Sequence, residues 1–164
     1  MNLDLILALK VLALALSANG APVIGKRLFG TRWAIPLDGG LTFLDGRPLL
    51  GSSKTVRGLV LSLAATTLVA LALGYGWQLG LAYSALTMSG DALSSFIKRR
   101  RGIPPSGRFR GLDQIPETAL PMWVCSAELG IAGWDIVVLV ALFFAGDFVL
   151  SKILYRLGIR DEPY

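Results

Sequence analysis

The chain has 164 residues, of which 54% are hydrophobic and only 16% are charged. Soluble domains carry about 25% charged residues, so the composition disfavours an ordinary soluble enzyme and favours an integral membrane protein. The sequence has no histidine and a single cysteine, Cys125. It therefore excludes an intrachain disulfide, a histidine general base and a zinc site built from His or Cys. Any catalysis must rest on carboxylates, hydroxyls, Lys and Arg, with or without a hard metal ion.

Five apolar runs predict five transmembrane helices, so the expected fold class is an all-α integral membrane protein with a single domain. The runs cover residues 3–18, 59–74, 77–97, 119–132 and 136–154. A span needs about 20 residues. The first, second and fourth runs are shorter than that, so they require flanking residues or a locally thin bilayer.

The basic residues predict how these helices are oriented. Most of the 16 Lys and Arg residues fall in segments 19–58 and 98–118 or near the C-terminus, and the connections 75–77 and 133–135 hold none. Positively charged loops stay in the cytoplasm. We therefore expect a multi-pass protein of the cell membrane with its N-terminus outside and its C-terminus inside. Both long loops, and any site that they form, would face the cytoplasm.

The first long loop contains two Asp-Gly pairs, at residues 38–39 and 45–46, around the apolar stretch Leu41–Leu44. Asp-Gly is a strong turn signal, so the pattern predicts a short β-hairpin that caps the helices. A ligand role for Asp38 is the alternative, because Gly39 and Gly40 would let a ligand approach the backbone closely.

The end of the same loop, residues 51–58, reads Gly-Ser-Ser-Lys-Thr-Val-Arg-Gly. It offers the hydroxyls of Ser53 and Thr55 and the cations Lys54 and Arg57, a combination that suits a phosphate. It is not a P-loop, because the first glycine of that motif and the preceding strand are missing. The alternative is a basic membrane anchor with a helix cap.

The third run carries a polar face at its cytoplasmic end. Asp91, Ser94, Ser95 and Lys98 follow helical spacing and share one side of the helix. Asp91 lies about 10 Å deeper than Lys98 at 1.5 Å rise per residue. A carboxylate at that depth is costly unless it is paired or binds a metal. A stabilising Asp91–Lys98 pair is the structural alternative to a functional site.

The next three residues are arginines, at positions 99–101. Arg100 and Arg101 are interpreted as residues that fix topology or contact anionic headgroups. Asp113 follows in the second loop and adds a second carboxylate near these cations. Oxygen ligands of this kind suit Mg²⁺, which binds one or two carboxylates together with substrate phosphates. The pattern indicates nucleotidyl transfer to a phosphorylated lipid, with no covalent nucleophile required.

A polytopic transporter or channel that uses intramembrane charges is the competing prediction. It would draw on Lys10, Asp91, Glu128 and Asp147. The sequence has no inverted repeat, which counts against a transporter. A scaffold that docks anionic lipid is a further alternative.

The motifs together resemble the CDP-diacylglycerol synthase (phosphatidate cytidylyltransferase) family. Its signature is similar to Gly90-Asp91, Ser95, Lys98-Arg99, Gly102-Ile103, Ser106-Gly107 and Leu112-Asp113, and its Lys-Thr-x-x-Gly element to Lys54-Thr55 and Gly58. The small size and the first-loop motifs Asn19-Gly20-Ala21, Pro36-x-Asp38-x-Gly40 and Asp45-Gly46 are most similar to the archaeal branch, whose product is CDP-archaeol. Pro116 stands where the bacterial pattern has a second aspartate, so the resemblance implies two metal-binding carboxylates.

The resemblance implies transfer of CMP from CTP to an isoprenoid glycerol phosphate lipid, unsaturated archaetidic acid, with pyrophosphate released. It implies Mg²⁺ as the cofactor, held by Asp91 and Asp113 with the Ser95 hydroxyl nearby. Lys54, Lys98 and Arg99 are expected to act on the phosphates. The full set expected to bind the nucleotide is Asn19, Asp38, Gly39, Gly40, Ser53, Lys54, Thr55, Arg57, Ser94, Ser95 and Gln114. No nucleic acid partner is expected, and a homodimer is left open.

Overall fold

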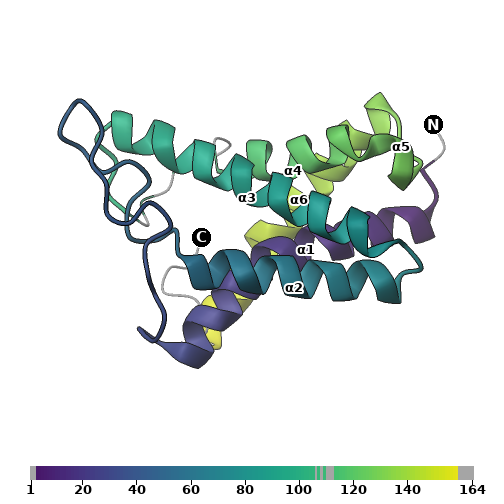
Figure 1. The fold of residues 1–164 in the computed structure, drawn as a ribbon. Coiled ribbons are helices and arrows are strands. Elements are labelled where there is room, and N and C mark those ends of the chain that lie inside the picture. Colours follow the sequence, from purple (N-terminus) through teal and green to yellow (C-terminus); the bar gives the residue numbers. More distant parts are fainter. Residues whose placement is uncertain (1–2, 106, 108, 110–112, 159–164) are drawn as a thin grey trace.

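The computed structural model describes residues 3–105, 107, 109 and 113–158. Its helices are α1 (Leu5–Phe29), α2 (Val56–Ala72), α3 (Trp77–Arg100), α4 (Gln114–Val124), α5 (Ser126–Leu129) and α6 (Gly133–Arg156) (Figure 1). No β-strand occurs among these described residues. The all-helical fold expected from the sequence is confirmed for this part of the chain.

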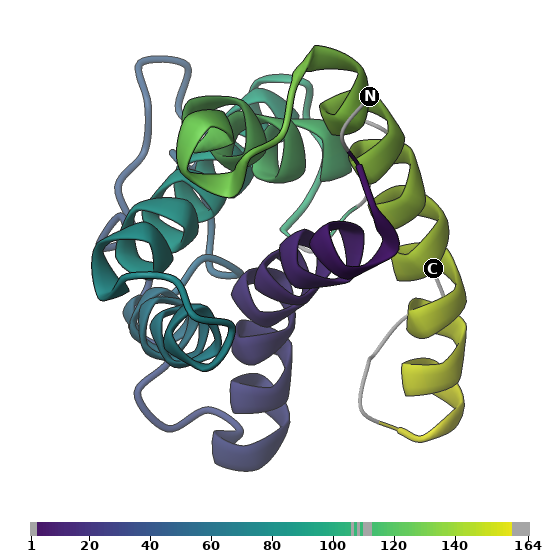
Figure 2. The ribbon, with the colours of Figure 1, turned by 90° about the vertical axis from the view of Figure 1, so that its right-hand side faces the viewer.

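Helix α1 lies at the centre of the arrangement. Figure 2 shows it between the α2–α3 pair on one side and α6 on the other, and it contacts α2, α3 and α6. Its Val11 and Leu14 side chains are fully buried, together with Leu139 of α6 and Tyr83 of α3. The core is therefore built around one apolar helix, because α1 is the element that every other long helix can reach.

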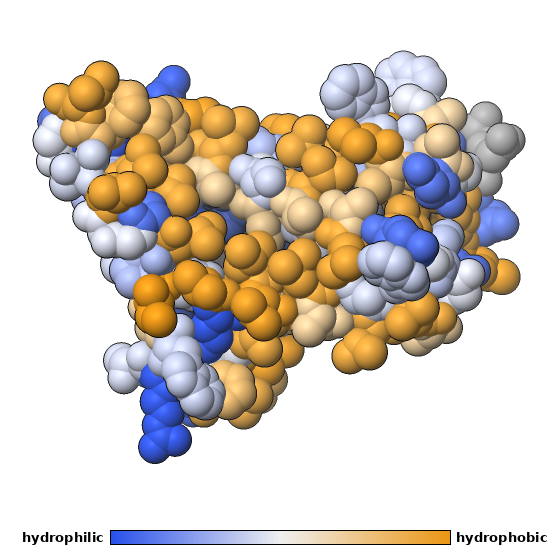
Figure 3. Space-filling view, in the orientation of Figure 1, coloured by the Kyte–Doolittle hydropathy of each residue, from blue (hydrophilic) through white to orange (hydrophobic). Residues whose placement is uncertain are grey.

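Two helices are long and apolar enough to cross a membrane, α1 and residues Gly133–Ile153 of α6, and α2 is a shorter apolar helix. Large apolar side chains on their outer surfaces stay exposed, such as Leu5, Ile6 and Val149. Figure 3 shows apolar residues spread over the visible face of the molecule. Such a surface suits lipid contact. The count of five spans and their orientation remain predictions.

Helix α1 continues well beyond residue 18, where the apolar run ends, so Asn19 and the residues up to Phe29 are helical rather than part of a loop. Pro22 sits inside this helix. A proline lacks the N–H that would bond the carbonyl four residues earlier, here that of Ala18. The Ser62 hydroxyl of α2 donates to this carbonyl at 2.8 Å. The neighbouring helix thus compensates for the missing bond, and the proline does not end the helix.

We expect Ser62→Ala to destabilise the fold by about 1–3 kcal/mol, because it leaves the buried Ala18 carbonyl without a partner. The same hydroxyl also lies 2.7 Å from the Ser84 hydroxyl of α3. The thermal unfolding midpoint in detergent micelles measures the effect. Ser89→Ala is the matched control, because the exposed Ser89 hydroxyl bonds only the Ala85 carbonyl of its own helix. Equal midpoints for the two variants would contradict the prediction.

Small residues let α1, α2 and α3 approach closely. A Cβ on Gly58 would lie 3.4 Å from Pro22 of α1, and a Cβ on Gly80 would lie 2.5 Å from the Cα of Thr67. Helices in membranes associate through such small residues and through hydroxyl hydrogen bonds, since lipid tails are as apolar as leucine. This close packing fixes the register of α2 against α3 and hence the height of residues at their ends.

The run predicted as the fourth span, 119–132, is helical but broken. Helix α4 ends at Val124, and the short α5 ends at Leu129 before Gly130, whose φ of 70° turns the chain. Asp135 in the first turn of α6 then accepts a hydrogen bond from the Ala132 N–H at 3.1 Å, which stabilises the start of that helix. The first residues of α4 lie beside α3, where Pro116 contacts Gly90.

The hairpin predicted around Leu41–Leu44 is reduced to a turn. The Phe43 N–H donates to the Arg47 carbonyl at 2.8 Å, and the Leu49 N–H donates to the Leu41 carbonyl at 2.8 Å. These bonds form an isolated bridge at residues 42 and 48, and no strand develops. A two-stranded hairpin is marginal by itself, and the end of α3 supplies the missing support.

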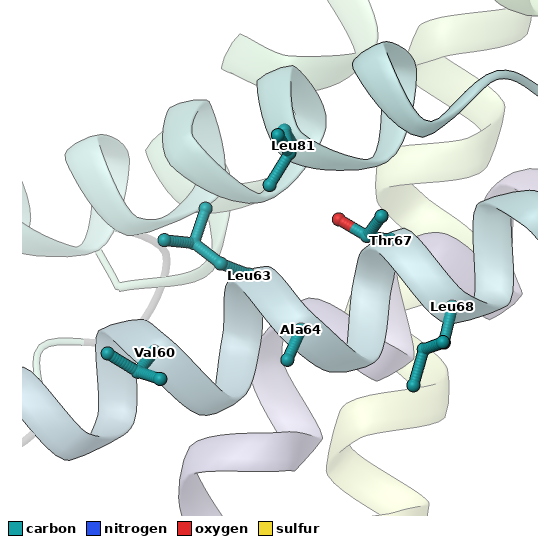
Figure 4. Close-up of a pocket in the computed structure, with 6 residues that line it drawn as sticks. All are labelled: Val60, Leu63, Ala64, Thr67, Leu68 and Leu81. Atoms are coloured by element: carbon teal, nitrogen blue, oxygen red, sulfur yellow. The ribbon is translucent and has the colours of Figure 1, made fainter.

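An apolar groove of about 470 Å³ runs between α2 and α3 (Figure 4). It is lined by Val60, Leu63, Ala64, Thr67, Leu68 and Leu81. None of these side chains carries a charge, so the groove does not suit a triphosphate. The charged residues gather elsewhere.

Candidate active site

Charged residues of both predicted loops contact α3: Lys54 and Asp45 of the first loop, and Asp113 of the second loop, pair with charged residues of this helix. Figure 1 shows the segment between α1 and α2 folded against the end of α3. Gly51 has a φ of 92°, and a Cβ there would lie 3.7 Å from the Arg99 Cδ. The left-handed backbone and the missing side chain let the first loop reach the helix that carries the polar face.

Lys54 and Asp91 form an ion pair. The Lys54 Nζ lies 2.5 Å from both carboxylate oxygens of Asp91, and each side chain is 21% exposed. The Lys54 backbone is fixed on both sides, because its N–H donates to the Gly51 carbonyl and its carbonyl accepts from the Leu37 N–H. The partner of Asp91 is thus a lysine 37 positions away, and not the lysine on its own helix.

Lys98 pairs instead with Asp113, which precedes α4. Its Nζ lies 2.6 Å from the Asp113 Oδ1 and donates to the Gly107 carbonyl at 3.1 Å. The pair is partly shielded from solvent, with the two side chains 9% and 18% exposed. Both carboxylates that the sequence singles out are therefore matched to lysines from the predicted phosphate-binding motifs.

Arg99 has a buried guanidinium with unused donors. The residue is 3% exposed, its Nε donates to the Ser95 carbonyl at 3.4 Å, and its two terminal nitrogens have no partner within the described part of the chain. Burial lowers the pKa of Arg99, and the nearby Asp113 carboxylate offsets part of that shift. The two terminal nitrogens are buried donors without a hydrogen-bond partner among the described residues, which is costly, so this geometry fits an anion that is supplied by a substrate.

Asp91, Asp113 and the Ser95 hydroxyl provide hard oxygen donors. The Ser95 Oγ is buried and makes no hydrogen bond to any described residue, whereas the Ser94 Oγ donates to the Gly90 carbonyl at 2.9 Å. The described residues contain no cluster of three or more Asp, Glu, His or Cys side chains that could hold a metal ion. This donor set fits Mg²⁺, since Mg²⁺ takes its remaining ligands from water and substrate phosphates.

Asp38 organises the first loop. Its carboxylate accepts the N–H groups of Gly40 at 3.0 Å, Leu50 at 2.8 Å and Gly51 at 3.2 Å. Burial works to raise the pKa of Asp38, but the backbone hydrogen bonds outweigh it and lower that pKa. The carboxylate is occupied within the loop, and its role as a nucleotide ligand stays a prediction.

Arg57 and Thr55 have structural contacts as well. The Arg57 Nη1 donates to the carbonyls of Gly30 at 2.9 Å and Arg32 at 2.5 Å, just beyond the end of α1. The Thr55 hydroxyl caps α2 by accepting the Gly58 N–H at 3.1 Å. The Thr55 contact is the helix cap named in the alternative for this motif, and a nucleotide contact of either residue stays a prediction.

The other predicted nucleotide ligands are scattered around this region. The Asn19 side chain donates to the Ala15 carbonyl of its own helix at 3.0 Å. Ser53 is exposed, Gln114 begins α4, and the turn at Gly39 and Gly40 has open space where side chains would stand. Their contact with a nucleotide remains a prediction.

Glu117 is a carboxylate that the sequence reasoning missed. A Cβ on Gly90 would lie 2.4 Å from the Pro116 carbonyl oxygen, so α3 and α4 touch next to Asp91. Burial and the Asp91 carboxylate are the main factors that raise the pKa of Glu117 well above its usual value. The signal available in the sequence was its spacing, because Glu117 follows Asp113 by four residues and shares its helix face.

Comparisons with known proteins find relatives over nearly the whole length of the chain. The family model described as CarS-like CDP-archaeol synthase matches residues 3–76 and 71–164. A CDP-archaeol synthase of Saccharolobus solfataricus is 40% identical, with 98% of this chain and 97% of the relative covered. One from Sulfurisphaera tokodaii is 33% identical, with 92% and 90% covered.

A solved structure is also similar. It is described as an intramembrane enzyme for archaeal membrane lipid biosynthesis, and it matches with a TM-score of 0.71 and 31% sequence identity. The match covers 88% of this chain and 92% of that chain. The helical arrangement in Figures 1 and 2 is thus shared with an enzyme that works inside the membrane.

The fold, the charged cluster and these matches define a membrane-embedded, CTP-dependent nucleotidyltransferase of lipid biosynthesis. This class decides against the transporter or channel alternative. The chain belongs to the CDP-archaeol synthase family, because the family model and the relatives cover nearly its whole length.

Proposed function

We propose that the chain transfers CMP from CTP to unsaturated archaetidic acid, an isoprenoid ether lipid phosphate. An oxygen of the lipid phosphate attacks the α-phosphorus of CTP in line. The bond from the α-phosphorus to the oxygen that bridges to the β-phosphate breaks, and that oxygen leaves with pyrophosphate. The products are CDP-archaeol and pyrophosphate. The nucleophile is already an anion, so no residue has to remove a proton.

The unsatisfied Arg99 guanidinium is the observation that carries this proposal. Its terminal nitrogens are buried without partners in the described residues. Asp113, which pairs with Lys98, is close enough to act on the charge of Arg99. In our proposal Arg99 binds a phosphate of CTP, and Lys54 and Lys98 stabilise the negative charge that develops on the leaving pyrophosphate. Preorganised cations of this kind lower the barrier most when they are shielded from water.

Asp91 and Asp113, with the Ser95 hydroxyl, would hold Mg²⁺. When bound, the ion supplies positive charge to the phosphate oxygens of the transition state. The chain's own part is to fix the two carboxylates, Asp91 within α3 and Asp113 before α4. The close contact between Gly90 and Pro116, which holds the first turn of α4 against α3, supports this proposal.

We further propose that the protein crosses the membrane five times, with this cluster on the cytoplasmic side, where CTP is available. The exposed apolar surfaces of α1, α2 and α6 support immersion in lipid. The lipid substrate would then present its phosphate at the membrane surface while its isoprenoid chains stay in the bilayer.

The test is incorporation of radiolabelled CTP into lipid by the purified protein in detergent or liposomes. We expect a labelled lipid when Mg²⁺ and the isoprenoid ether lipid phosphate are both present. ATP and dNTP in place of CTP, and EDTA, serve as controls and should give little product. Equal incorporation from ATP, or undiminished incorporation in excess EDTA, would contradict the proposed nucleotide or metal.

A further inference from the structure

Arg100 ties the first loop to the end of α3. Its guanidinium pairs with the Asp45 carboxylate. The same group donates to the carbonyls of Pro48 and, at 3.3 Å, of Arg47. One side chain of α3 thus binds a side chain and two backbone carbonyls of residues 45–48.

The Arg100 guanidinium also contacts two aromatic rings. Its Cζ lies 4.8 Å from the ring centre of Phe43 in the loop and 5.1 Å from that of Phe96 in α3. The two rings meet edge to face with their centres 5.3 Å apart. Cations over aromatic faces and edge-to-face ring pairs are both stabilising. The Arg100 guanidinium is therefore held by specific contacts with the protein and does not extend freely into solvent.

Arg47 makes the reciprocal contact. Its Nη1 donates to the carbonyl of Arg100 at 2.5 Å and to that of Arg99 at 3.5 Å. The last carbonyls of a helix lack partners within the helix, and a cation there is favourable. We call Phe43, Asp45, Arg47, Phe96 and Arg100 the arginine clasp.

A continuous set of backbone contacts leads from the clasp to Lys54. The Asp38 carboxylate holds the N–H groups of Leu50 and Gly51. The Leu37 N–H holds the Lys54 carbonyl at 2.7 Å. The loop between the clasp and Lys54 thus has little freedom once the clasp is formed.

We propose that Arg100 and Arg47 are positioning residues that hold residues 36–55 on α3, so that the Lys54 ammonium reaches Asp91. Both terminal nitrogens of Arg100, and the Nη1 of Arg47, bond the protein rather than a phosphate or a lipid headgroup. This assignment replaces the interpretation of Arg100 as a topology or headgroup residue. It rests on the role proposed above for Lys54.

The first test is a double-mutant cycle with Arg100→Ala and Lys54→Ala. We expect Arg100→Ala to lower kcat/KM on the order of 10–10²-fold, since displacements near 1 Å have effects of that size. In the Lys54→Ala background the same substitution should cost less than about twofold, because coupled residues are not additive. Full additivity would show that Arg100 does not act through Lys54 and would overturn the proposal.

Two controls separate positioning from charge. Arg101→Ala removes an adjacent, exposed cation and should keep the activity. Arg100→Lys keeps the charge but loses the planar, multiple hydrogen bonds, so we expect it to remain impaired. Full rescue by lysine, or equal losses for positions 100 and 101, would favour a role in topology or headgroup binding and would contradict the clasp.

Amide hydrogen exchange provides a readout that does not depend on activity. We expect the Leu50, Gly51 and Lys54 amides to exchange faster in Arg100→Ala, because their loop loses its anchor. Asp45→Asn is a milder variant if Arg100→Ala does not fold. Unchanged exchange in a folded variant would overturn the clasp. If Lys54→Ala were fully active, the proposed role of Lys54 would fail while the exchange data still tested the clasp.

Discussion

Asp91→Ala is expected to lower the turnover of CMP transfer on the order of 10²–10⁴-fold. The Asp91 carboxylate is a proposed metal ligand that pairs with Lys54. Its loss removes transition-state stabilisation on the order of several kcal/mol. The substitution also removes the counter-ion of the Lys54 ammonium, which lies 2.5 Å from the Asp91 carboxylate in the unsubstituted protein. Initial rates of labelled CTP incorporation at saturating Mg²⁺ measure the effect.

Glu128→Gln is the matched control for this prediction. Glu128 is an exposed carboxylate in the short helix α5, away from the loops that hold Lys54. We expect this variant to retain near wild-type turnover. Near wild-type turnover by Asp91→Ala in detergent would remove Asp91 from the catalytic assignment.

Arg99→Met is expected to lower activity while the thermal unfolding midpoint stays the same or rises. A buried guanidinium whose terminal nitrogens have no partner in the described chain destabilises the fold, and an apolar side chain of similar length removes that cost. If Arg99 binds a CTP phosphate, we expect a loss of turnover on the order of 10². The turnover then falls while the unfolding midpoint stays the same or rises.

Arg101→Met is the comparison for this second prediction, because Arg101 is exposed next to the same helix end. We expect little change in its rate or its unfolding midpoint. A large fall in the midpoint of Arg99→Met would instead mean that Arg99 is needed for folding. Unchanged activity would exclude Arg99 from binding the nucleotide.

The sequence predicted the helical class because the length and the composition of an apolar run are local properties. It did not predict that α1 would continue through Pro22, since the compensating Ser62 hydroxyl comes from another helix. The reduced hairpin has the same explanation: residues 43–48 are stabilised by Arg100 of α3, and not by a partner strand. Contacts between distant segments decide both features.

The candidate site shows the same limit. The sequence could single out Asp91, because a carboxylate in an apolar run beside cations is rarely without a function. The pairing was not predictable, since helical spacing connects Asp91 with Lys98, whereas the fold connects it with Lys54. Glu117 became visible only when Gly90 brought α4 against α3.

The two lysine–carboxylate pairs have a consequence for how ligands enter. Each pair is electrically neutral. A polyphosphate that binds both lysines therefore leaves the carboxylates of Asp91 and Asp113 without counter-ions. A divalent cation that binds both carboxylates leaves the two lysine ammonium groups without counter-ions. Only when the polyphosphate and the divalent cation bind together does every lysine and every carboxylate keep an opposite charge beside it. Nucleotide and cation should therefore strengthen each other's affinity by the same factor, as thermodynamic linkage requires.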